Sequence, residues 1–177
     1  MSILAESWRD LPPSLAEVLE PELPEITHEI LVAIADEVPD YARSLESAFG
    51  EALRRGVDEA LRRFVMLVRA PDSVDDRGRR ASVALGRAEL RAGRTLDALQ
   101  AAYRVGARVA WRRLATATEQ AGIDQTTAAR LAEAIFAYID GLSADSVEGY
   151  AQAQSERAGE LERRRTELLD IHLTGVE

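Results

Sequence analysis

Apolar residues recur three and four positions apart along most of the chain, the spacing that places side chains on one face of an α-helix. No segment alternates apolar and polar residues with the two-residue period of a strand, and the sequence contains no Asn-Gly hairpin dipeptide. The sequence therefore predicts an all-α fold. The predicted helices cover residues 14–20, 23–39, 40–69, 74–92, 95–121 and 125 to nearly the end.

Residues that start or stop helices separate these segments. Ser14 and Glu17 have the spacing of a capping box. Thr95 is placed to cap the fifth helix, and Gly93 is placed to end the fourth. Asp124 stands where the chain turns into the last helix. Short connections between five or six helices favour a helical bundle.

Two helices carry small residues where a core face is expected. The fourth helix offers only a slight apolar face, which we expect to consist of Ala81, Ala84, Leu85 and Ala88. In the fifth helix, Gly106 lies on the apolar line between Tyr103 and Ala110. We therefore expect another helix to cross at close range at Gly106.

The chain divides into three parts by its apolar content. Residues 1–13 contain Pro12 and Pro13 and are expected to form a flexible arm, residues 14–150 a helical bundle, and residues 151–177 a long connector helix. A monomer would leave the apolar positions of the connector largely exposed, so we expect a homodimer that covers them. These positions are Val147, Ala151, Ala158, Leu161 and Leu168.

Composition and charge narrow the possible partners. The chain has 22 arginines, no lysine and 31 acidic residues, and its net charge of −9 argues against a surface that coats nucleic acid. The absence of cysteine excludes disulfides, thiolate zinc sites and cysteine nucleophiles, and fits a cytoplasmic protein. No apolar run approaches the length of a membrane span, and no signal peptide is visible, so no membrane partner is expected.

Residue patterns that would indicate catalysis or a metal site are weak. The sequence contains no glycine-rich phosphate loop and no nucleophile elbow, which favours a protein that is not an enzyme. Glu25 and His28 have the Glu-x-x-His spacing of di-iron bundles, but no second copy of the motif exists. We therefore expect no metal and no cofactor, and a partly buried His28 that is hydrogen-bonded to a neighbour.

Arginines four positions apart make the fifth helix the best candidate for ligand binding. Arg104, Arg108 and Arg112 place three guanidinium groups on one helix face, where they could bind a small anion next to aromatic side chains. The candidate ligand site comprises Tyr103, Arg104, Arg108, Trp111 and Tyr138. The alternative is a solvated face whose arginines pair with acids of neighbouring helices, such as Glu89 or Glu133.

Two long stretches carry a family resemblance. GRAELRAGRTLDALQAAYRVGARVAWRRLA (Gly86 to Ala115) and EAIFAYIDGLSADSVEGYAQAQSERAGELERRRTELL (Glu133 to Leu169) resemble the amino-terminal sensory region of actinobacterial PucR-type (CdaR-like) transcriptional regulators. That region is similar in turn to the helical N-terminal domain of the RsbT co-antagonist protein RsbRD. The resemblance extends from about residue 45 onward and implies a regulatory input module. Analogy with the globin-like domain of related stress regulators raises a globin-like arrangement.

The resemblance also implies a larger protein. In such regulators the segment after ERRRTELL leads through a further domain to a helix-turn-helix, so we expect this chain to be a fragment that reaches DNA only through that absent domain. Our leading hypothesis is a non-enzymatic sensory and dimerisation domain of a cytoplasmic transcriptional regulator. The alternative is a protein-interaction module of a stress-signalling type that binds no small molecule.

Overall fold

The computed structural model describes residues 7–42, 46–73 and 76–174, with side chains described up to residue 169. Every regular element in these ranges is helical and none is a strand, which confirms the predicted all-α fold with a long C-terminal helix. No helix in the described part of the chain is long and apolar enough to cross a membrane. The elements are α1 (Leu15–Leu19), α2 (Leu23–Glu37), α3 (Ala48–Arg69), α4 (Arg77–Arg91), α5 (Leu96–Gln120) and α6 (Gln125–Thr174), with the short 3₁₀ helices η2 (Glu20–Glu22) and η3 (Pro39–Tyr41).

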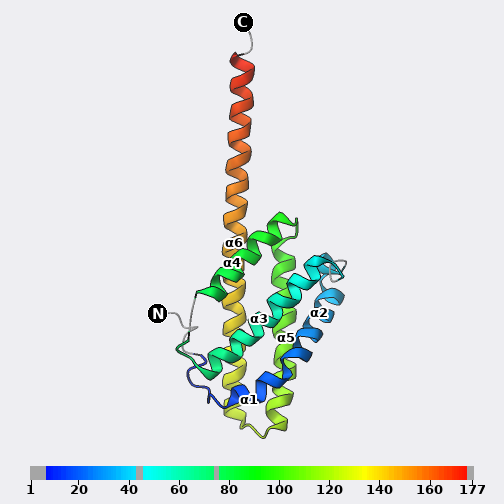
Figure 1. Cartoon of the computed structure of the whole chain (residues 1–177), viewed down its shortest axis with the longest axis vertical. Helices are drawn as coiled ribbons and strands as arrows, with labels where there is room; N and C mark the ends of the chain where they lie inside the picture. Colours follow the sequence, from blue (N-terminus) through cyan, green and yellow to red (C-terminus); the bar gives the residue numbers. More distant parts are fainter. Residues whose placement is uncertain (1–6, 43–45, 74–75, 175–177) are drawn as a thin grey trace.

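The last helix organises the molecule. Figure 1 shows α6 running along the whole long axis, first inside the bundle and then alone beyond it. Within the bundle α6 packs against the antiparallel α5, α2 packs against both α3 and α5, and α4 lies across α6. Residues after α4's crossing therefore leave the bundle as an uncovered helix.

The N-terminal segment is part of the core where the structure describes it. Trp8 and Leu11 are 6% and 3% exposed, so this part of the expected flexible arm, residues 1–13, is packed. Residues 1–6 of the expected arm lie outside the described residues. The Leu11 N–H donates to the Trp8 carbonyl at 3.2 Å, which folds the segment into a turn. The Trp8 ring packs edge-on against Tyr138 of α6, with 6.3 Å between the ring centroids. Burial of the large indole surface holds the segment against the bundle.

Several of the predicted helix ends are confirmed. The Thr95 side chain accepts a hydrogen bond from the Ala98 N–H at 3.1 Å and caps α5. Gly93 has a φ angle of +75°, the left-handed conformation that glycine adopts at the end of a helix. Asp124 accepts a hydrogen bond from the Thr127 N–H at 2.9 Å at the start of α6.

The predicted capping box at Ser14 and the predicted start of the third helix are wrong, although the first helix itself begins where it was expected. Ser14 has a helical backbone and its side chain makes no capping hydrogen bond, so the expected capping box is absent. The third helix begins at Ala48 rather than at residue 40, because residues 39–41 form the 3₁₀ helix η3 and Ser47 has an extended backbone. The Ser47 side chain accepts from the Phe49 N–H and caps α3.

The closest helix crossing joins α4 to α6. A Cβ atom added at Gly86 would lie 1.8 Å from the Ser146 carbonyl oxygen, and one added at Gly149 would lie 2.0 Å from the Val83 carbonyl oxygen. The Ser146 hydroxyl donates to the Ser82 carbonyl oxygen at 3.0 Å across the same contact. Because glycine has no side chain at either position, the two backbones touch directly.

This crossing corrects two expectations. The buried residues of α4 are Ser82, Gly86 and Glu89. The expected apolar face is wrong, since the three alanines at positions 81, 84 and 88 are exposed and Leu85 is half-buried. A Cβ atom at Gly106 would lie 3.8 Å from Ile30, an ordinary contact, so no close crossing occurs there. The tight packing that we expected at Gly106 lies at Gly86 and Gly149 instead.

Candidate functional site

The five candidate ligand residues lie at different helix interfaces. The Tyr103 hydroxyl is hydrogen-bonded to the Ser146 hydroxyl at 2.7 Å, between α5 and α6. The Tyr138 hydroxyl donates to the Ala60 carbonyl oxygen of α3 at 2.9 Å. Arg108 is exposed and forms an ion pair with Glu37 at the end of α2.

The remaining two candidate residues, Arg104 and Trp111, also lie in different environments. Arg104 is exposed, and Trp111 is partly buried against the hydrophobic core. The structure therefore does not gather the five side chains around one cavity, and ligand binding by them stays a prediction. Tyr103 and Arg104 are adjacent in the sequence and therefore point about 100° apart around α5, so they face different neighbours. Which helix each one meets is decided by tertiary packing.

Acidic residues of α2 and η2 pair with the arginines of α5. Besides the pair of Arg108 and Glu37, Arg113 donates to Glu22 and to Glu29, each at 2.8 Å. Arg108 therefore pairs with an acid of a neighbouring helix, as the alternative interpretation expected. That acid is Glu37, however, and not Glu89 or Glu133. These pairs are substantially exposed, so each contributes little to stability.

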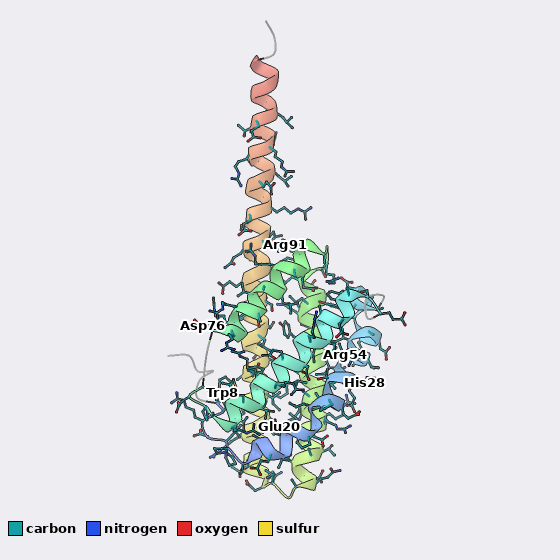
Figure 2. All side chains as sticks on the ribbon, in the orientation of Figure 1. Trp8, Glu20, His28, Arg54, Asp76 and Arg91 are labelled. Carbon is teal, nitrogen blue, oxygen red and sulfur yellow. The ribbon has the colours of Figure 1, made fainter. Side chains whose placement is uncertain are left out.

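His28 does not have the environment that we expected. Its side chain is exposed on α2, where Figure 2 shows it at the surface, and not partly buried. It lies beside an open groove of about 810 Å³ between α2 and α5, whose lining includes Arg112 and Arg113. Within the described residues, no group of three or more potential metal-ligating side chains comes together.

The most buried charge in the described chain is Glu89 of α4, which is 1% exposed. Its carboxylate accepts two hydrogen bonds from Arg94, at 2.6 and 3.0 Å, and one from the Tyr41 hydroxyl at 2.8 Å. The Arg94 guanidinium lies 3.7 Å from the centroid of the Phe49 ring. The Tyr150 hydroxyl donates to the Arg94 carbonyl oxygen at 3.1 Å.

This cluster of Tyr41, Phe49, Glu89, Arg94 and Tyr150 connects four parts of the bundle. It joins the loop after α4 to η3, to the start of α3 and to α6. From the sequence, we expected Glu89 only as a partner for the arginines of α5. The spacing of the sequence could have indicated that Glu89 is buried. Glu89 follows Ser82 and Gly86 at helical spacing and so shares the face of α4 that packs on α6.

Ion pairs join α4 to α6 on both sides of the glycine contact. Arg79 donates to Glu148 at 2.6 Å, near the start of α4. Arg87 donates to both carboxylate oxygens of Glu156, at 2.7 and 3.2 Å, near its end. Two-point pairing of this kind fixes orientation as well as distance. Helix α4 is thus held on α6 in one register.

Three buried or half-buried tyrosines, Tyr41, Tyr103 and Tyr138, have raised pKa values. Burial and then the Glu89 charge raise the pKa of Tyr41 far above its usual value, and burial is the largest cause of the raised pKa values of Tyr103 and Tyr138. In the unfolded chain these phenols ionise near pH ~10. Since the folded pKa values are the higher ones, their contribution to stability is complete below pH ~10 and is lost as pH rises above it.

We therefore expect the free energy of unfolding to be nearly constant between pH 7 and 9 and to fall above pH ~10. The expected fall is about 1.4 kcal/mol per pH unit for each tyrosine that is protonated in the folded protein but ionised in the unfolded chain. Urea unfolding followed by circular dichroism at pH 9 and pH 11 measures this loss. The Tyr41→Phe variant should show a shallower fall than the wild type. A wild-type stability that is equal at both pH values would contradict the assignment.

Comparison with known families completes the description. The family model of the PucR-like N-terminal domain matches residues 8–173, which include the bundle and the projecting part of α6. No curated protein and no solved structure matches the chain significantly. The match covers nearly all of the chain and agrees with the resemblance seen in its sequence. The chain therefore belongs to the family of PucR-like N-terminal domains.

Proposed function

We propose that this chain is a non-enzymatic sensory and dimerisation domain of a cytoplasmic transcriptional regulator, and that α6 carries its output. Membership in the PucR-like family supports a regulatory sensory role. The observation that carries the proposal is the continuity of α6. Leu131 and Ala134 near its start are fully buried, whereas Leu161 and Leu168 are 60% and 63% exposed on the same unbroken helix. A change in the bundle can therefore move the projecting segment directly.

The second half of α6, from the α4 crossing into the projecting part, has the spacing of a two-stranded coiled coil. Its positions alternate four and three residues apart at Val147, Ala151, Gln154, Ala158, Leu161, Arg165 and Leu168. In a parallel pair, Arg157 of one copy would face Glu162 of the other, because flanking positions five residues apart pair in this way. Large exposed leucines in register and complementary charge both favour a second copy as the partner of this face.

The junction with α4 makes the output helix respond to the rest of the bundle. Backbone contact at Gly86 and Gly149 leaves no side chains that could yield between the two helices. The cluster around Glu89 ties the end of α4 to η3 and α3. Any rearrangement of these elements is then transmitted to α6 as a shift of packed helices rather than absorbed locally.

A protein-interaction module that needs no small molecule is the second candidate. The open groove between α2 and α5 favours it, since Val32 is 45% exposed within the groove lining. A partner in this groove would contact α2 and α5, whereas a dimer through α6 would leave the groove free. The oligomeric state therefore separates the dimerisation proposal from simple interaction through the groove.

Light scattering tests the dimer. We expect a mass twice the 19.4 kDa of the protomer at tens of micromolar protein. The Leu161→Glu, Leu168→Glu double variant should be monomeric with an unchanged circular dichroism spectrum, since both side chains are exposed within one copy. The matched control, Arg163→Glu on the opposite helix face, should stay dimeric. A monomeric wild type at this concentration would contradict the proposal.

A further inference from the structure

A second concave site lies on the other side of the bundle from the α2–α5 groove. It is a pocket of about 140 Å³ formed by the N-terminal segment, the end of α3, the start of α4 and α6. Figure 2 shows Trp8 near the end of α3 and Asp76 just before α4, which mark this side of the molecule. Its walls are mainly apolar and include Trp8, Leu67, Tyr138 and Leu142.

We propose that this pocket binds a small organic carboxylate whose apolar body is about the size of one aromatic ring. This inference deepens the proposed sensory role and rests on it. A domain that senses a small molecule needs a binding site whose occupation changes the packing of the output helix, α6. A buried cavity of about 150 Å³ lined by apolar side chains is large enough to bind benzene. The pocket has similar room and opens to solvent, where a charged group can remain hydrated.

Two arginines supply hydrogen-bond donors of the kind that a carboxylate accepts. Arg63 and Arg79 both line the pocket, together with the carboxylate of Asp145. Arg63 also forms a long ion pair with the exposed Glu59, at 4.0 Å. Only 13% of the Arg63 side chain is exposed, and a Cβ atom at Gly78 would lie 2.6 Å from its Nε, so the arginine runs directly beneath the first turn of α4. A partly desolvated guanidinium binds carboxylate more strongly than an exposed one does.

Donor capacity remains on the second arginine. Arg79 donates to Glu148 and its Nε lies 3.7 Å from Asp145, but a guanidinium has five N–H donors in total. The indole Nε1 of Trp8, at the same wall, is buried without a hydrogen-bond partner. A buried donor without an acceptor is uncommon in folded proteins, and here it adds to the excess of donors over acceptors.

The place of the pocket on α6 explains how binding would reach the output. Tyr138, Leu142 and Asp145 lie on the α6 side of the pocket, within three turns of Gly149 at the crossing with α4. The opposite wall includes Gly78 and Arg79 at the start of α4. A bound carboxylate would therefore bridge α3, α4 and α6 and bias the register in which α4 sits on α6.

Benzoate is the probe that tests this proposal, with benzamide and benzylamine as neutral and cationic controls of equal size. The chain has two tryptophans, so a Trp111→Phe background makes Trp8 the only fluorescent indole. We expect saturable benzoate binding that changes Trp8 emission, with the two controls binding at least about tenfold more weakly, since a hydrogen bond to a charged group has this size of effect.

Variants locate the binding. Ala137→Leu fills the pocket and should abolish benzoate binding, and Arg79→Gln should weaken it about tenfold. Arg130→Gln, the matched control at an exposed arginine outside the pocket, should bind as the wild type does. Absence of saturable binding up to the solubility limit, equal binding of benzamide, or full binding by Ala137→Leu would each overturn the proposal. Light scattering on the same samples distinguishes the two proposals. A dimeric protein that does not bind benzoate would contradict only the proposed ligand site. A monomeric protein that binds benzoate would contradict only the proposed dimer.

Discussion

The Gly149→Ala variant is expected to lose about 3 kcal/mol of unfolding free energy, at the upper end of the usual cost of overpacking. The added Cβ atom would lie 2.0 Å from the Val83 carbonyl oxygen, far inside van der Waals contact, so α4 must move away from α6. That movement also lengthens the hydrogen bond from Ser146 to the Ser82 carbonyl oxygen. Urea unfolding measures the loss, and Gly86→Ala should behave in the same way.

Gly56→Ala is the matched control. Gly56 lies inside α3, and a Cβ atom there would meet nothing within 4 Å. Alanine favours a helix over glycine by roughly 0.5–1 kcal/mol, so this variant should be slightly more stable than the wild type. The same substitution is thus expected to have opposite signs at the two positions. If Gly149→Ala were as stable as Gly56→Ala, the close contact of α4 with α6 would be disproved.

The second large effect is expected at Glu89. Its replacement by alanine leaves the Arg94 guanidinium without its carboxylate partner and removes the acceptor of the Tyr41 hydroxyl. Breaking a buried ion pair by removing one member costs about 3–5 kcal/mol. Only 14% of the Arg94 side chain is exposed, so water compensates little of this loss. Chemical unfolding of Glu89→Ala should show a decrease in this range.

Two further variants show whether the loss of stability comes from the unpaired charge of Arg94 or from the mere removal of a glutamate side chain. Glu133→Ala replaces an exposed glutamate, and a surface substitution of this kind usually changes stability by less than about 0.5 kcal/mol. Replacing both Glu89 and Arg94 with leucine should recover part of the loss, because no unpaired charge then remains. A Glu89→Ala variant that is no less stable than Glu133→Ala would show that the cluster does not stabilise the fold.

Local chemistry explains which features of the fold could be predicted from the sequence. The ends at Gly93 and Thr95 depend on neighbouring residues alone, and both were predicted correctly. The buried face of α4 was predicted wrongly, because hydrophobic periodicity assumes that a helix buries its apolar side chains. This helix buries Ser82, Gly86 and Glu89 instead, where backbone contact and a charge cluster replace apolar packing.

The candidate site shows the same limit at longer range. Sequence spacing placed Arg108 correctly on an exposed face of α5, but its partner, Glu37, lies 71 residues earlier in the chain. Tyr138 was expected beside the arginines of α5, whereas its hydroxyl bonds to α3 and its ring packs on Trp8. Which helices become neighbours is decided by tertiary packing, and one sequence carries little information about it. The long C-terminal helix was predicted correctly, because helical periodicity is a property of one segment and needs no knowledge of its neighbours.

Disulfide cross-linking of the projecting helix tests the proposed dimeric output most directly. The chain has no cysteine, so the Leu161→Cys and Leu168→Cys variants each introduce a single thiol on the coiled-coil face. Arg163→Cys places the thiol roughly 200° around the helix from residue 161. Two cysteines form a disulfide only when their Cα atoms approach within about 7 Å. We predict rapid covalent dimers from the Leu161→Cys and Leu168→Cys variants under mild oxidation and none from Arg163→Cys, whereas equal cross-linking at all three positions, or none at any, would contradict a parallel pair of α6 helices.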